Sequence, residues 1–185
     1  MKLEKGRRLW TEVKNCPVCK SDNAQITQLG ALNDAVSVNC GTYGRYRVSF
    51  MTQLRISDDV LERSTESSVL SYYIRRMQTD ESTERVLTDA MVEEFLKRQL
   101  PSAAEQADNF VLWVGDRTPP GQTKSIQLKQ DYPLIGAHLD SGLCFIISGL
   151  MKAGLIDSNS MDRAALSFNG WRRYHELKKG QSDSK

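Results

Sequence analysis

The spacing of apolar residues changes at about Val60, and this change predicts two kinds of secondary structure. Before it, three short stretches alternate apolar and polar residues, as half-buried β-strands do: AQITQLG, AVSVNC and GRYRVSF. In the last of them, Tyr46, Val48 and Phe50 share one face. Residues 15–50 are therefore predicted to form a small antiparallel β unit.

Beyond about Val60 the apolar residues recur at helical spacing. The first predicted helix carries five of them on one face: Val69, Leu70, Tyr73, Ile74 and Met77. Two further helices are predicted before the turn TPPGQ. Thr88 is placed to cap the first, and Ser102 with Glu105 forms a capping box for the second.

The C-terminal third has the element order of a winged-helix domain. SIQLK predicts a short strand, helices follow over about 131–139 and 142–154, and AALSF is strand-like. Gly154 lies where a residue ending a helix is commonly left-handed, and Ser167 is placed to cap a final helix. The order of elements is two helices, the segment KAGLI, a short linker, the segment ALSF and a last helix.

These elements predict an α+β fold in three parts, followed by a polar tail at 181–185. The parts are a small zinc-ribbon-like antiparallel β unit (1–52), a helical middle (53–118) and a C-terminal winged-helix-like unit (119–180). Residues 1–50 carry eight basic side chains against four acidic, residues 51–118 eight against thirteen, and residues 119–185 nine against six. Basic ends around an acidic middle favour a modular chain.

Composition excludes several other classes of protein. Hydrophobic residues make up 39% of the chain and charged residues 26%, as in an ordinary globular protein. No apolar run approaches the roughly 18 residues that span a bilayer. The N-terminal segment MKLEKGRRLW lacks the apolar stretch of a signal peptide. We therefore expect a cytoplasmic protein without a membrane partner.

Three of the four cysteines lie in the predicted β unit and suggest a zinc site. Cys16 and Cys19 flank Pro17-Val18, and such a Cys-x2-Cys knuckle supplies two adjacent thiolates. The twenty residues before Cys40 suit two strands and a turn that bring Cys40 back as a third ligand. The place of a fourth cysteine holds Tyr43, whose phenol, with a reference pKa near 10, is a poor zinc ligand.

Two interpretations of this cluster stay open. Three thiolates hold zinc together with a fourth ligand from elsewhere, such as water, His138, His175 or another chain. Alternatively, the β unit has lost its metal and Tyr43 fills the space.

Basic side chains raise the alternative of a nucleic-acid interface. Arg45 and Arg47 alternate with Tyr43 and Tyr46, which is compatible with phosphate contacts and base stacking, although a solvated strand face explains the same pattern. Arg172 and Arg173 add positive charge to the last predicted helix.

The helix predicted over 142–154 occupies the place of a recognition helix but offers only Ser148 and Lys152 as polar groups. A helix that reads base edges needs polar or basic side chains, so a buried helix or a partner-binding surface is the better interpretation. The candidate interaction residues are Phe145, Ile146 and Met151.

Nothing in the sequence supports catalysis. It contains no Gly-rich phosphate loop, no HExxH and no nucleophile elbow. Cys144 with His138 would be a nucleophile and base only by analogy, because a thiol among apolar neighbours behaves as a small hydrophobe.

Six short motifs occur in the order found in a group of bacterial proteins: CPVC, CGTYGRYRVS, LPS, DYPL, LMKAGLI and ALSFNGWRRYHEL. On these motifs, the chain resembles the N-terminal region of proteins that continue into a nucleoside 2-deoxyribosyltransferase-like or TIR-like domain, several of them associated with anti-phage defence. The second knuckle of that pattern is Cys-x-x-Cys-Gly-x-Tyr, which Cys40, Gly44 and Tyr46 match and Tyr43 does not. The resemblance implies a regulatory region whose catalytic half would begin beyond Lys185.

Together these observations predict a non-catalytic recognition or regulatory module of a bacterial defence-type effector. It would sense a partner or ligand, or mediate assembly, with a protein partner or self-association favoured by the apolar helix and the acidic middle. A nucleic-acid-binding regulator is the alternative.

Overall fold

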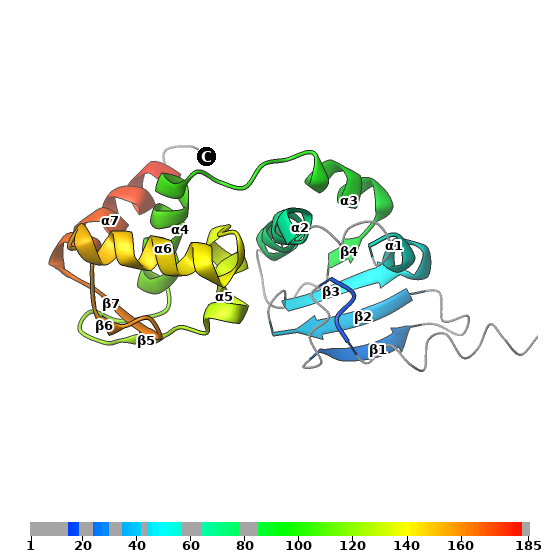
Figure 1. The fold of residues 1–185 in the computed structure, drawn as a ribbon, viewed down its shortest axis with the longest axis horizontal. Coiled ribbons are helices and arrows are strands. Elements are labelled where there is room, and N and C mark those ends of the chain that lie inside the picture. Colours follow the sequence, from blue (N-terminus) through cyan, green and yellow to red (C-terminus); the bar gives the residue numbers. More distant parts are fainter. Residues whose placement is uncertain are drawn as a thin grey trace, which may run out of the picture. The chain divides into compact units, whose positions relative to one another are not determined.

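The structure, a computed structural model, describes residues 15–18, 24–29, 35–41, 44–56, 64–77 and 85–182 (Figure 1). The chain divides into two compact units, Met1–Gln99 and Leu100–Lys185. The first contains β1 (Gln25–Leu29), β2 (Ala35–Cys40), β3 (Gly44–Ser49), α1 (Phe50–Arg55), α2 (Ser64–Met77), β4 (Arg85–Leu87) and α3 (Asp89–Leu96). The second contains α4 (Ala103–Gly115), β5 (Lys124–Ser125), α5 (Leu128–Ile135), α6 (Leu139–Lys152), β6 (Ile156–Ser160), β7 (Arg163–Leu166) and α7 (Phe168–Ser182). The predicted α+β class is confirmed.

The N-terminal unit is a four-stranded sheet in the order β1-β2-β3-β4. The three strands predicted from alternation form β1, β2 and β3, which pair antiparallel, and β4 adds parallel to β3. Neither β4 nor α1 was predicted. Phe50, expected on a strand face, instead begins α1, because the Ser49 hydroxyl accepts the Thr52 N–H at 3.1 Å and ends the strand with a helix cap.

Alternation gives this sheet two different faces. One face packs on α1, α2 and α3, whose buried side chains share one core with those of the sheet. The buried core of the unit lies between these layers and includes Val36, Val38, Tyr46, Val48, Leu70, Ile74, Leu87, Val92 and Phe95. The side chains of the other face stay exposed or half-exposed.

The C-terminal unit is winged-helix-like, with its strands paired antiparallel in the order β5-β7-β6. The predicted helices over 131–139 and 142–154 each begin three residues earlier, as α5 and α6. The segment expected as a linker forms β6, which completes the wing with β7. Apolar side chains of α4, α5, α6 and the sheet build one core, including Phe110, Val111, Ile135, Leu143, Ile147, Leu150 and Leu166. The helices predicted for the middle segment lie in both units, α2 and α3 in the first and α4 in the second.

Local end signals in the sequence are confirmed where the structure describes them. The Thr88 hydroxyl accepts a backbone N–H of α3, and Ser102 with Glu105 makes both halves of a capping box on α4. The Ser167 hydroxyl accepts a backbone N–H from the first turn of α7. Gly154 follows α6 with a φ of 65°.

Among the described helices, none taken singly combines the length and hydropathy of a membrane span. Helices α5 and α6 meet that test only as a pair, which is bent by 73° at the break between them.

Candidate functional site

Two of the three predicted metal ligands lie in the core of the N-terminal unit. Cys16 and Cys40 are 0% and 1% exposed, among the apolar side chains on the inner face of the sheet. Cys40 ends β2 opposite Gly44, whose φ of 75° is readily adopted by glycine at the turn into β3. Cys19 and Tyr43 lie outside the described residues, so their part in the site stays a prediction.

Tyr46 links Cys16 to the sheet. Its hydroxyl lies 3.2 Å from the Sγ atom of Cys16, and both groups are buried. Tyr46 is paired with Val38 on β2, and Val38 precedes Cys40 by two residues on the same face. The phenol therefore reaches the sulfur from the face that carries Cys40. A buried polar group left without a hydrogen bond costs about 1–3 kcal/mol, so this contact also stabilises the core.

Zinc binding by this cluster stays a prediction. Within the residues that the structure describes, no three His, Cys, Asp or Glu side chains group closely enough to hold a metal ion. Cys16 and Cys40 are buried in an apolar enclosure, and cysteine sulfur is a ligand that zinc prefers. The residues present fit part of a thiolate site. The Tyr46 hydroxyl is a hydrogen-bonding partner of one of the two sulfur atoms, that of Cys16.

The residues predicted to bind nucleic acid differ in exposure and belong to two units. Arg45 and Arg47 are exposed on the outer face of β3, whereas Tyr46 between them is 0% exposed. The prediction that Tyr46 stacks on bases is therefore wrong, because the strand pleat directs its ring into the core. Arg172 is exposed on α7, in the other unit.

Arg173 holds two helices of the C-terminal unit together. Its Nε and Nη2 atoms donate to the carboxylate of Asp108 on α4 at 2.9 and 2.7 Å, and Glu176 lies 3.6 Å from Nη1. The hydrogen bond to Asp108 raises the pKa of the Arg173 guanidinium. This bidentate geometry commits Arg173 to joining α7 to α4.

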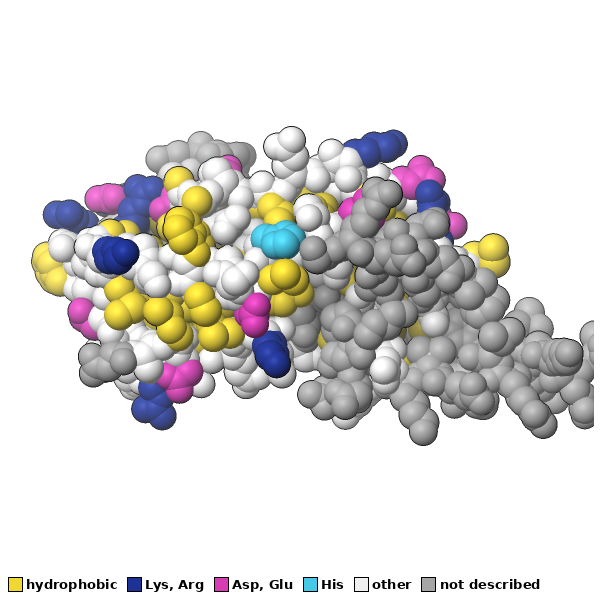
Figure 2. All heavy atoms as spheres, in the orientation of Figure 1, with side chains coloured by type: hydrophobic (Ala, Val, Ile, Leu, Met, Phe, Trp, Pro, Cys, Tyr) yellow, Lys and Arg dark blue, Asp and Glu magenta, His cyan; other side chains and the backbone are white. Residues whose placement is uncertain are grey.

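The three predicted interaction residues on α6 have different environments. Phe145 is 70% exposed, and Met151 is half-buried. Ile146 is only 4% exposed, so its assignment to the surface is wrong: it packs into the core of the unit. Figure 2 shows hydrophobic side chains exposed on the side of this unit where α6 lies in Figure 1.

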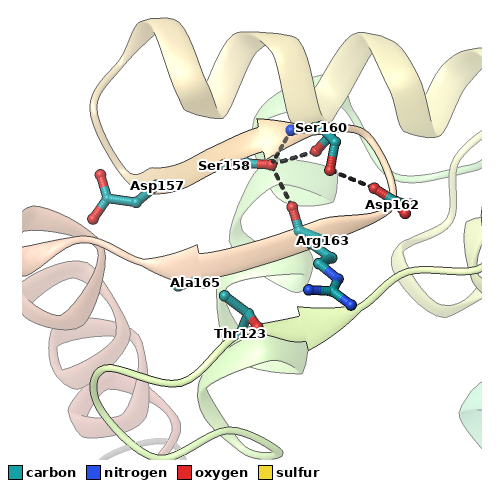
Figure 3. A pocket seen from close by; sticks show the side chains of 7 residues that line it. All are labelled: Thr123, Asp157, Ser158, Ser160, Asp162, Arg163 and Ala165. Carbon is teal, nitrogen blue, oxygen red and sulfur yellow. Dashed lines mark hydrogen bonds between the residues drawn. The ribbon is translucent and has the colours of Figure 1, made fainter.

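A pocket lies on the wing of the C-terminal unit and was not predicted from the sequence (Figure 3). Its lining comes from the end of the turn before β5 and from the β6–β7 hairpin, and comprises Thr123, Asp157, Ser158, Ser160, Asp162, Arg163 and Ala165. The Ser158 hydroxyl bonds to the carbonyl groups of Ser160 and Arg163, and the Ser160 hydroxyl bonds to Asp162. The only signal in the sequence was a run of Asp, Ser and Asn, which indicates a turn.

Hydrogen bonding within the hairpin explains the polar lining of this pocket. The Ser160 hydroxyl lowers the pKa of Asp162, keeping that carboxyl ionised. The bonds of Ser158 span the bulge at which the β6–β7 register shifts. These side chains therefore shape the wing.

Neither family models, curated proteins nor solved structures give a match when compared with this chain.

Proposed function

We propose that the chain is a non-catalytic recognition and assembly module that self-associates through α6 of its winged-helix-like unit. The observation that carries the proposal is the 70% exposure of Phe145 on the helix in the recognition position. Burying a phenylalanine side chain is worth about 1.5–3 kcal/mol. A few well-packed side chains near the centre of an interface dominate its binding energy.

The exposed face of α6 is poorly suited to reading DNA. Besides Phe145, its exposed residues are Ser141, Gly149 and Lys152. A recognition helix needs polar or basic side chains that reach base edges, and one lysine in the last turn does not supply them. Asp140 in the first turn adds a negative charge, which a phosphate backbone repels.

The residues around Phe145 suit an antiparallel pairing of two copies. Ser141 and Gly149 lie four residues before and after Phe145 and therefore share its face of α6. A two-fold axis near Phe145 would bring Gly149 of each copy towards Ser141 of the other. Ser141 and Gly149, which are small and exposed, would let the two helices approach closely.

Oligomeric mass, measured by light scattering over a range of concentrations, tests this proposal. We expect the wild-type chain to dimerise and Phe145→Glu to be monomeric. Phe168→Glu is the matched control, since Phe168 is 87% exposed at the start of α7 in the same unit.

Two results would contradict the proposal. The first is a wild-type chain that stays monomeric at its highest attainable concentration. The second is a dimer that survives Phe145→Glu while the variant keeps its fold by circular dichroism.

The resemblance to N-terminal regions of defence-type effectors supports a regulatory role for this assembly. In such an effector, pairing of the regulatory region would bring attached or associated catalytic domains together. Zinc held by Cys16, Cys19 and Cys40 belongs to the same proposal as a structural ion, which would tie the knuckle to the turn after β2.

A further inference from the structure

The sheet face of the N-terminal unit that points away from its helices carries two rows of polar side chains. The strand register places three residues from β1, β2 and β3 in each row, and all six side chains are exposed or half-exposed. The first row is Gln25, Asn39 and Arg45, and the second is Thr27, Ser37 and Arg47. These six residues are named the polar sheet face.

The polar sheet face offers hydrogen-bond donors throughout. Its side chains are two amides, two hydroxyls and two guanidinium groups, and each type has at least one donor. None of the six is a carboxylate. A surface of this kind is complementary to a ligand that is negatively charged and rich in acceptor oxygens.

We propose that the polar sheet face binds the sugar-phosphate backbone of single-stranded nucleic acid. Arg45 and Arg47 extend from one strand in the same direction, with Cα atoms about 7 Å apart. Two guanidinium groups at this spacing can contact neighbouring phosphates of one strand. Ser37 and Asn39, on the adjacent strand, are of the residue types that commonly bond to phosphate and sugar oxygens.

The dimensions and chemistry of the face favour one strand over a duplex. Three strands span about 10 Å between the outer strand axes, which suits a single backbone. None of the six side chains is aromatic, and Tyr46 is buried, so bases gain no stacking platform here. Binding should therefore be independent of sequence and governed by phosphate charge.

An acidic peptide is the other anionic ligand to consider, and the centre of the face disfavours it. Protein interfaces draw their energy from buried aromatic or apolar anchors. The middle strand offers only Ser37 and Asn39, and the large apolar side chains, Leu29 and the 53%-exposed Val86, are at the margins. A peptide would find charge here without an anchor.

Fluorescence anisotropy of the full chain with labelled oligothymidylate and oligouridylate of about 20 nucleotides, longer than most site sizes, tests the proposal. We expect binding whose logarithm falls with log salt at a slope of about −1.4 for two phosphate contacts. Arg45→Glu/Arg47→Glu should weaken binding at least about tenfold. Arg47→Gln alone should make the slope shallower by about 0.7, because one phosphate contact is lost. Arg172→Glu, a single charge reversal at an exposed residue of α7, is the control and should change affinity little.

Several outcomes would overturn the inference. One is an affinity that Arg172→Glu reduces as much as Arg45→Glu/Arg47→Glu does. Another is tighter binding of duplex DNA or of polyglutamate than of either single strand. If the double reversal fails to fold, Arg45→Gln/Arg47→Gln decides the question, and unchanged binding by that variant refutes the proposal. Phe145→Glu should keep nucleic-acid binding, which separates this inference from the assembly through α6.

Discussion

Replacing Gly170 with alanine should destabilise the C-terminal unit. Gly170 lies in the first turn of α7, where its N–H is capped by the Ser167 hydroxyl. A Cβ atom built there would lie 2.0 Å from the carbonyl oxygen of Leu155, closer than real Cβ contacts allow. That carbonyl also accepts the Ser167 N–H at 3.1 Å, so it is held in place by the same helix start.

The size of the effect follows from the clash and from what must move to relieve it. Overpacking costs about 1–3 kcal/mol. Moving the start of α7 away from Leu155 also strains the bonds of Ser167 to Leu155 and to the Gly154 carbonyl, each worth about 1 kcal/mol. Alanine returns at most about 1 kcal/mol of helix propensity. A net loss of about 2 kcal/mol should lower the Tm of a unit this size by about 8–16 °C.

Thermal unfolding by circular dichroism and tryptophan fluorescence measures this loss, since Trp113 and Trp171 belong to the affected unit. Gly180→Ala is the control: Gly180 lies within α7, and a Cβ there meets nothing within 4 Å. It should leave Tm unchanged or raise it. Equal Tm values for Gly170→Ala and the wild type, or equal losses in both variants, would refute the reasoning.

Three further predictions concern single contacts. Purified wild-type protein should contain zinc, and the Cys16→Ser variant should not. A zinc content below about 0.1 equivalent in the wild type, together with a fold that a chelator leaves unchanged, would exclude the metal site. Hydrogen bonds from the backbone N–H of Ser102 and, to a smaller extent, from its hydroxyl lower the pKa of Glu105. The ionised Glu105 carboxylate therefore stabilises α4 at neutral pH, and this contribution is lost as the pH falls through the lowered pKa. In Glu105→Gln, this part of the acid dependence of Tm should be absent. A double-mutant cycle with Asp108→Ala and Arg173→Ala should give a coupling of about 0.5–1 kcal/mol, reduced by the partial exposure of both side chains; a value near zero would mean that the bidentate pair does not join α4 to α7.

The N-terminal strands were predictable because their information is local. Alternation assigned β1, β2 and β3 and already placed Tyr46 with Val48, so the same pattern argued against Tyr46 as a base-stacking residue. Strand β4 was not predictable, because three residues carry no periodicity and its parallel pairing to β3 depends on tertiary contacts. Helix α1 was missed for a related reason: the Ser49 cap interrupts a stretch whose alternation would otherwise continue through Phe50.

The candidate sites were harder to predict, because they depend on which side of an element faces solvent. Helix α6 is apolar around much of its circumference, so periodicity could not separate exposed Phe145 from buried Ile146. Only the packing of α4, α5 and β6 against α6 makes that distinction. Likewise, nothing local in the basic run of α7 signals the partner of Arg173, since Asp108 lies 65 residues away.

Strand β3 connects the buried cysteines to the polar sheet face, and this connection predicts how metal removal would act. The pleat sends Tyr46 inward to Cys16 and sends Arg45 and Arg47 outward, and a slip of one residue would exchange the two faces. Zinc bound beside the turn after Cys40 would hold this register without touching either arginine. A chelator should therefore weaken oligothymidylate binding while leaving the slope against log salt unchanged, because the number of phosphate contacts is the same. If a chelator instead makes the slope shallower, the ion itself contributes charge to the contact with the nucleic acid, and its effect does not act through the register of β3.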